Sequence, residues 1–205
     1  MNIGIYSYAH SSLNDEIAFY QKLVFDKFSI SIKQIISDDN HPTILEKIIC
    51  DSTEDYLIFF DIDCIPLDRI FFEKISNDIK SDCTLSGVIQ CANHIDKYRT
   101  YVGASFVGFS KVLYTACGNP SMFNWDEGDV MQRFTDECEK LKEELMVNVK
   151  YWFPTNSGDN CWNIEKYNMK YGHGTIYDDI IYHQFEIRNE LQHDGFIRKC
   201  KEVLC

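Results

Sequence analysis

The chain has 205 residues, of which 45% are hydrophobic and 25% charged, and its formal net charge is −12. This composition is that of a folded globular protein, and the length predicts one domain with a substantial core. The negative charge argues against nucleic acids and anionic membranes as partners. No stretch approaches the roughly 20 apolar residues of a membrane span, and the N-terminus has no basic leader before an apolar run. We therefore expect no membrane insertion.

The nine cysteines are scattered, with no C-x-x-C pair and no zinc-like spacing. Cys50, Cys91 and Cys138 lie in apolar stretches of sequence. This distribution is typical of buried, reduced thiols rather than of a disulfide framework. Together with the missing signal peptide, it predicts a cytoplasmic protein.

The first half of the chain alternates between strand-like and helix-like patterns. Apolar runs with short links predict strands, and stripes at helical spacing predict helices. The expected strands are residues 2–8, 29–36, 56–60 and 84–90, and the expected helices are about 13–28 (capped by Ser11 or Ser12), 43–50 and 67–80. Such alternation favours an α/β fold with a mostly parallel central sheet and helices on both faces.

The second half is less regular. It contains a glycine-rich segment at 101–111, a long helix expected to begin near Asp126, a strand around 147–153 and a C-terminal helix at about 187–204. A segment with two histidines precedes that helix.

The segment YLIFFDIDCIPL, residues 56–67, carries an apolar strand directly to Asp61 and Asp63. Ligands of open α/β sheets bind at the carboxyl ends of the strands, and residues i and i+2 of a strand point to the same side. Both carboxylates are therefore expected to converge on a hard cation, Mn²⁺ or Mg²⁺, or one of them on the cation and the other on a sugar hydroxyl. The alternative is that they face solvent or cap the helix near Asp68.

This segment resembles the Asp-x-Asp motif of glycosyltransferases with the GT-A fold, in which an apolar strand delivers the motif to the diphosphate of a nucleotide sugar. The resemblance implies a Rossmann-like GT-A domain over residues 1–205, with a nucleotide-sugar half at about 1–110 and an acceptor and metal half at about 111–190. It also implies that Asp63 is the direct metal ligand and that Asp61 lies toward the ribose or sugar.

Further segments follow in the order that this fold requires. ISDDNHP is similar to the turn that reads the base in many members, so Asp38 or Asp39 is expected to contact uracil or guanine, with Tyr8 also on the donor side. VGASFVGFSK is similar to the loop beside the donor sugar, which places Gly103 there.

NWDEGDVMQRF resembles the acidic motif that faces the acceptor, which makes Asp129 the expected general base, with Asp126 behind it. GT-A enzymes often supply a further metal ligand from a histidine near the C-terminus. His183 and His173 both qualify, and His183 is favoured because it follows an apolar run and precedes Arg188, a group suited to phosphate.

The resemblance thus implies a transferase that moves a sugar from a UDP- or GDP-linked donor to a hydroxyl of a glycan or other acceptor, with inversion. Two alternatives remain. A haloacid-dehalogenase-like phosphatase also carries Asp-x-Asp after an apolar strand, and Tyr177–Ile180 resembles its late acidic pair. Cys64, Ile65 and Pro66 depart from that motif, however. The other alternative is a nucleotide-sugar-binding module without catalysis.

Overall fold

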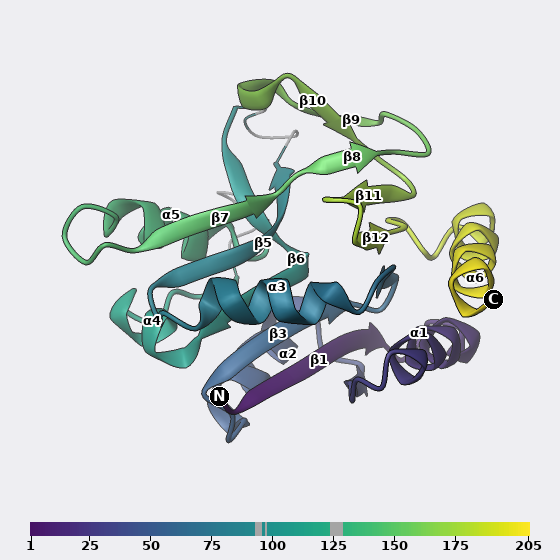
Figure 1. Cartoon of the computed structure of the whole chain (residues 1–205), viewed down its shortest axis with the longest axis horizontal. Helices are drawn as coiled ribbons and strands as arrows, with labels where there is room; N and C mark the ends of the chain where they lie inside the picture. The colour runs from purple at the N-terminus through teal and green to yellow at the C-terminus, as the bar shows by residue number, and fades with distance from the viewer. Residues whose placement is uncertain (93–95, 97, 124–128) are drawn as a thin grey trace.

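The computed structural model describes residues 1–92, 96, 98–123 and 129–205. A six-stranded sheet forms its centre (Figure 1), in the order β2 (Lys33–Ser37), β1 (Ile3–His10), β3 (Tyr56–Asp61), β6 (Thr100–Ser110), β5 (Thr84–Cys91) and β7 (Asn148–Trp152). Neighbouring strands are parallel except at β6, which runs antiparallel to both β3 and β5. The predicted mostly parallel sheet is confirmed.

Helices cover both faces of this sheet. One face packs against α2 (His41–Asp51), α4 (Lys111–Ala116) and α5 (Gln132–Lys140), and the other against α1 (Asp15–Lys27) and α3 (Ile70–Ile79). In β3, Leu57 and Phe59 enter the first layer, whereas Ile58 and Phe60 enter the second. Because alternate residues of a strand face opposite sides, a strand covered on both faces reads as an unbroken apolar run.

Two small sheets and a last helix complete the molecule. The first small sheet has the order β4 (Cys64–Pro66), β12 (Ile181–His183), β11 (Thr175–Tyr177) and β8 (Pro154–Asn156). The second pairs β9 (Trp162–Ile164) with β10 (Met169–Tyr171), linked by a 3-10 turn at Glu165–Tyr167. Helix α6 (Glu190–Leu204) lies beside α1 (Figure 1). Three-residue strands are too short to show a periodicity, so the sequence did not predict them.

Several expected boundaries were wrong. Helix α1 is capped by Asn14, whose side chain accepts the N–H of Glu16, while the Ser11 hydroxyl donates to Asp38. Strand β2 begins at Lys33 rather than at 29. The helix expected from Asp126 begins only at Gln132, because Met131 has φ 74°, outside the helical region. Asp126 itself lies outside the described residues.

Two further expectations need correction. Residues 101–110 form part of strand β6 and not a loop. Cys50 is exposed, as are Cys161 and Cys205, although all nine cysteines are free thiols as expected. Within the described ranges, no helix is both long enough and apolar enough to cross a bilayer.

A charge cluster at the start of the sheet makes stability depend on pH. Hydrogen bonds from Lys33 and from Tyr6 lower the pKa of Glu54 from 4.5 to about 2. A carboxyl group whose pKa is lower in the folded than in the unfolded state stabilises the fold at pH values above its unfolded-state pKa. For Glu54 this contribution is lost as the pH falls from 4.5 toward 2. Because the Lys33 side chain is 56% exposed, solvent screens the pair, and we expect Glu54→Gln to cost about 1 kcal/mol at pH 7.

The measurement is urea unfolding of wild type and Glu54→Gln between pH 7 and pH 3. The difference between them should shrink as the pH falls. The exposed Glu73, changed to Gln, is the control and should show a small, nearly constant difference. A Glu54→Gln difference that stays constant across this range would contradict the role given to the cluster.

Candidate functional site

The two motif aspartates lie on the turn that joins the large sheet to the small one. Strand β3 ends at Asp61, Ile62 and Asp63 form a turn, and β4 begins at Cys64. The side chain of Gln21, fully buried in α1, donates from Nε2 to the carbonyls of Asp61 (2.8 Å) and Cys64 (2.9 Å). This clamp satisfies the turn's buried carbonyls and fixes the backbone that carries both carboxylates.

Strand pairing brings one of the two candidate histidines to these aspartates. In the antiparallel pair of β4 and β12, His183 lies opposite Cys64, the residue after Asp63. His183 Nε2 is 3.2 Å from Asp63 Oδ1 and 3.8 Å from Asp61 Oδ2. One ligand atom from each of these three residues lies within 4.8 Å of the others. His173 belongs to a different cluster, with its Nδ1 2.6 Å from Asp159 Oδ2.

The chemistry of this donor set fits Mn²⁺ or Mg²⁺. Two carboxylates and one imidazole are acceptable ligands for these ions, and imidazole favours Mn²⁺. Asp63 and His183 are buried, with 6% and 3% exposure, and burying carboxylates side by side without a cation is costly. Burial raises the pKa of Asp61, with Asp63 adding to the rise and His41 opposing it. His183 Nδ1 is buried with no hydrogen-bond partner among the described residues.

A cavity of about 370 Å³ opens beside the aspartates at the ends of β1 and β2. Its lining includes Tyr8, Asp38, His41, Asp61, Asp63 and Arg188. The Tyr8 ring stacks on His41 at 5.2 Å, and the Tyr8 hydroxyl donates to the carbonyl of Asp39. Asp38 lines this cavity, whereas the Asp39 carboxylate pairs with Lys47 at 2.6 Å.

A second cavity of about 270 Å³ lies on the other side of the same aspartates. Strand β6 reaches it because its pairing with β3 stops at Phe106 opposite Phe60, so residues 101–105 extend past the paired part of β3. The Tyr101 hydroxyl lies 2.9 Å from Asp129 Oδ2, and both residues line the cavity. His41, Asp61 and Asp63 line both cavities and so form the boundary between them.

Gly103 does not line either cavity. A Cβ atom at this position would lie 2.3 Å from Cδ of Gln90, so the glycine makes room for a side chain of the neighbouring strand. Gln90 in turn donates to Ser105 at 3.0 Å and lies 3.1 Å from the Tyr101 hydroxyl. The side chain of Gln90 therefore fills the space beside this glycine. Gln90 lines the second cavity, whereas Gly103, which was expected beside the donor sugar, does not.

The polar cavity-wall residues that the sequence missed include His41, Gln90, Tyr101, Ser105 and Glu186. His41 Nε2 lies 3.3 Å from Asp61 Oδ1. Because His41 begins helix α2 just after the Asp-Asp turn, its position next to that turn was the sequence feature that could have identified it. Gln90 and Tyr101 could have been found only from the pairing of β5 with β6, in which they lie opposite each other.

The late acidic pair of the phosphatase alternative lies elsewhere. Asp178 pairs with Lys74 and accepts the N–H of Phe153 at 2.8 Å. Asp178 and Asp179 both have positive φ in the turn between β11 and β12, and neither lines the two cavities. In this structure Asp178 is a turn residue that ties helix α3 to the small sheet.

No protein-family model and no curated protein sequence matches the chain. Among solved structures it is similar to A197 from STIV, with 12% sequence identity, 67% of this chain and 78% of that chain covered, and a TM-score of 0.48. It is also similar to CMP:2-keto-3-deoxy-manno-octonic acid synthetase complexed with CTP (9% identity, 75% and 90% covered, TM-score 0.44). A third is a glycosyltransferase involved in the glycosylation of the major capsid of PBCV-1 (8% identity, 75% and 81% covered, TM-score 0.38).

Proposed function

We propose that this protein is a metal-dependent glycosyltransferase of the GT-A type that uses a nucleoside-diphosphate sugar. The observation that carries the proposal is the convergence of Asp61, Asp63 and His183 at the boundary between two cavities. A reaction that separates a diphosphate from a sugar needs a cation at the bond that breaks and room on either side of it. This arrangement supplies candidate ligands for the cation and a cavity on each side of them.

The charge of the first cavity supports a metal-bound diphosphate. Its walls carry the carboxylates of Asp38, Asp61 and Asp63 against a single guanidinium, that of Arg188. An anionic diphosphate enters such a site only with a divalent cation. Arg188 is exposed and has no acidic partner within the part of the chain that the structure describes, so it is available to the phosphates. Asp38 and Tyr8, which line the same cavity, would contact the base and ribose of a UDP or GDP moiety.

The second cavity is assigned to the transferred sugar and the acceptor. Asp129 removes the proton of the attacking acceptor hydroxyl, and the Tyr101 hydroxyl holds this carboxylate in position. Attack from this side, opposite the diphosphate, inverts the anomeric centre. Asp61, Asp63 and His183 would hold Mn²⁺ or Mg²⁺, which neutralises the negative charge developing on the departing diphosphate.

A panel of nucleotide sugars, each with and without Mn²⁺, tests this function by thermal unfolding. A ligand that binds only the native state raises the melting temperature by mass action. We expect one UDP- or GDP-linked sugar to stabilise the protein only when Mn²⁺ is present. No stabilisation by any nucleotide sugar, or stronger stabilisation by a nucleoside triphosphate, would contradict the proposal.

Release of nucleoside diphosphate from the stabilising donor then separates a transferase from a binding module. A catalytically competent transferase slowly passes the sugar to water, whereas a module without catalysis releases none. Phosphate release from a generic phosphomonoester should stay at background, because Asp178 is paired with Lys74 and neither Asp178 nor Asp179 lines the two cavities.

A further inference from the structure

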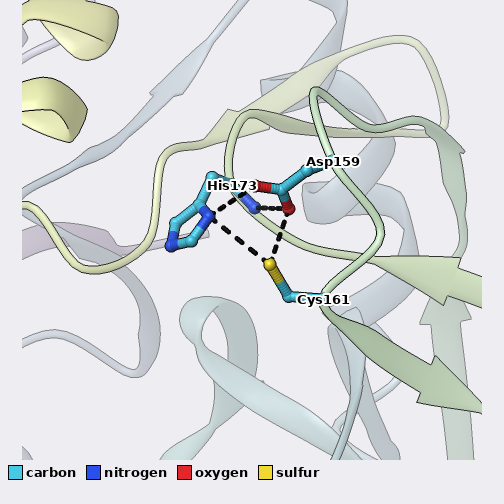
Figure 2. A group of neighbouring side chains, drawn as sticks. All are labelled: Asp159, Cys161 and His173. Carbon is cyan, nitrogen blue, oxygen red and sulfur yellow. Dashed lines mark hydrogen bonds and ion pairs between the residues drawn. The ribbon is translucent and has the colours of Figure 1, made fainter.

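A second group of metal-binding side chains lies outside both cavities described above. Asp159 and Cys161 are in the loop between β8 and β9, and His173 is in the turn between β10 and β11. Figure 2 shows the three side chains pointing toward one another. The pairing of β9 with β10, in which Trp162 lies opposite Tyr171, brings these two segments together.

The three donor atoms surround one point. Cys161 Sγ is 2.9 Å from Asp159 Oδ1 and 3.6 Å from His173 Nδ1, and His173 Nδ1 is 2.6 Å from Asp159 Oδ2. One atom from each residue lies within 4.8 Å of the others. A carboxylate oxygen, a thiolate sulfur and an imidazole nitrogen form a set that suits Zn²⁺ better than Mg²⁺ or Ca²⁺.

The other nitrogen of His173 provides an independent observation. His173 Nε2 is 3.1 Å from Glu186 Oε2, on the side of the ring away from the cluster. A histidine that binds a metal through one nitrogen commonly donates its other N–H to a carboxylate, which fixes the tautomer and the ring orientation. The Trp162 ring, 5.6 Å from the imidazole, packs against the same side chain.

The backbone around Asp159 is shaped for this arrangement. A Cβ atom at Gly172 would lie 2.1 Å from Asp159 Oδ1, so only glycine leaves the carboxylate in place. The backbone N–H of His173 donates to the same oxygen at 2.9 Å.

A Cys-His-Asp nucleophilic site is the competing interpretation, and the contacts oppose it. In such a site the cysteine and the acidic residue contact opposite nitrogens of the imidazole, so that one orients the base and the other gives up its proton. Here Cys161 and Asp159 both approach Nδ1, and Glu186 occupies Nε2. His173 therefore has no free nitrogen with which to act as a general base between Cys161 and Asp159. A metal ion bound by all three residues, in contrast, requires Cys161 and Asp159 to lie at the same nitrogen.

We propose that Asp159, Cys161 and His173 form a second metal site, for a zinc-class divalent cation, with Glu186 as the orienting carboxylate. Binding converts the Cys161 thiol to a metal-bound thiolate and replaces any proton on His173 Nδ1, the displaced protons going to solvent, while Asp159 binds as the carboxylate. Asp159 is 43% exposed, so water can reach the ion and complete its coordination. Since Glu186 also lines the second cavity, the bound ion fixes one wall of the proposed acceptor site.

Titration with Co²⁺, a spectroscopic substitute for Zn²⁺, tests the site in the full chain under a phosphine reductant. The Asp63→Ala variant is used as the background, because it removes a ligand of the first site and so separates the two proposals. We expect one equivalent of Co²⁺ to produce the near-ultraviolet thiolate-to-metal absorption, and Zn²⁺ to displace it. The band should disappear in Cys161→Ser and persist in the control Cys205→Ser, another exposed cysteine.

Glu186→Gln tests the orienting role and should weaken Co²⁺ affinity roughly tenfold while keeping the band. Melting curves of each variant without metal show whether the fold is retained, and His173→Ala provides a second ligand variant should Cys161→Ser fail to fold. No thiolate band with the Asp63→Ala protein, or an unchanged band after Cys161→Ser, would overturn the proposal. Neither result depends on whether the protein transfers sugars.

Discussion

Asp63→Ala is expected to abolish the Mn²⁺-dependent binding of a nucleoside diphosphate while leaving the protein folded. Asp63 is 6% exposed and lies 3.2 Å from His183, so the substitution removes a buried ligand from the proposed metal site. At a ligand concentration 100 times Kd, the wild type should gain about 2.7 kcal/mol of stability, or roughly 5–10 °C in Tm for a chain of this size. The variant should gain nothing measurable.

Asp68→Ala is the matched control for this experiment. Asp68 lies in the same stretch of chain, is exposed, and accepts the N–H of Ile70 at 2.8 Å near the start of α3, away from both cavities. It should lose a little stability without metal but keep the full Mn²⁺-dependent gain. Calorimetry with Mn²⁺ and UDP or GDP gives the affinity directly, and an unchanged Kd in Asp63→Ala would remove this residue from the site.

Asp129→Asn is expected to lower the rate of transfer by about 10²–10⁴-fold, the usual contribution of a positioned base, with little effect on donor affinity. The amide has the shape of the carboxylate and can still accept the hydrogen bond from Tyr101, but it cannot take up the acceptor's proton. Because Asp129 lines only the second cavity, the Mn²⁺-dependent binding of the nucleoside diphosphate should be preserved. The measurement compares kcat for transfer with Kd for the donor.

Glu139→Gln, an exposed carboxylate on α5, serves as the control and should transfer at the wild-type rate. Tyr101→Phe should cause a smaller loss than Asp129→Asn, because it removes only the group that positions the base. Full transfer activity in Asp129→Asn would exclude Asp129 from the chemistry. Glu186, the other carboxylate that lines only the second of these two cavities, would then be the next candidate.

The central strand and its acidic end could be predicted from sequence because their signals are local. Residues 56–60 are apolar without interruption, and in the structure Leu57, Ile58, Phe59 and Phe60 are at most 2% exposed. A strand buried on both faces must have this pattern, and two charges at its end must lie where the sheet stops. The same reasoning placed Asp61 and Asp63 together, although Asp63 lies on the turn after the strand and not within it.

The sequence favoured His183 over His173 because His183 follows an apolar run, but strand pairing decided the choice. Only β12 pairs with β4, and this pairing puts His183 beside Asp63. The pairing of β5 with β6 had a similar effect, because Gln90 of β5 fills the space beside Gly103 while Tyr101 and Ser105 line the second cavity.

The sequence alone determined the fold class, the acidic strand end and the short list of candidate ligands. These depend on the spacing of apolar residues and on residue type, which can be read within a few neighbouring residues. Tertiary structure decided which candidates meet. The Gln21 clamp spans 40 residues to Asp61. The Asp159, Cys161 and His173 cluster has no spacing that the sequence flags, and it is formed by the pairing of β9 with β10. Contacts between distant segments are set by strand register and packing, which the order of residues along the chain does not display.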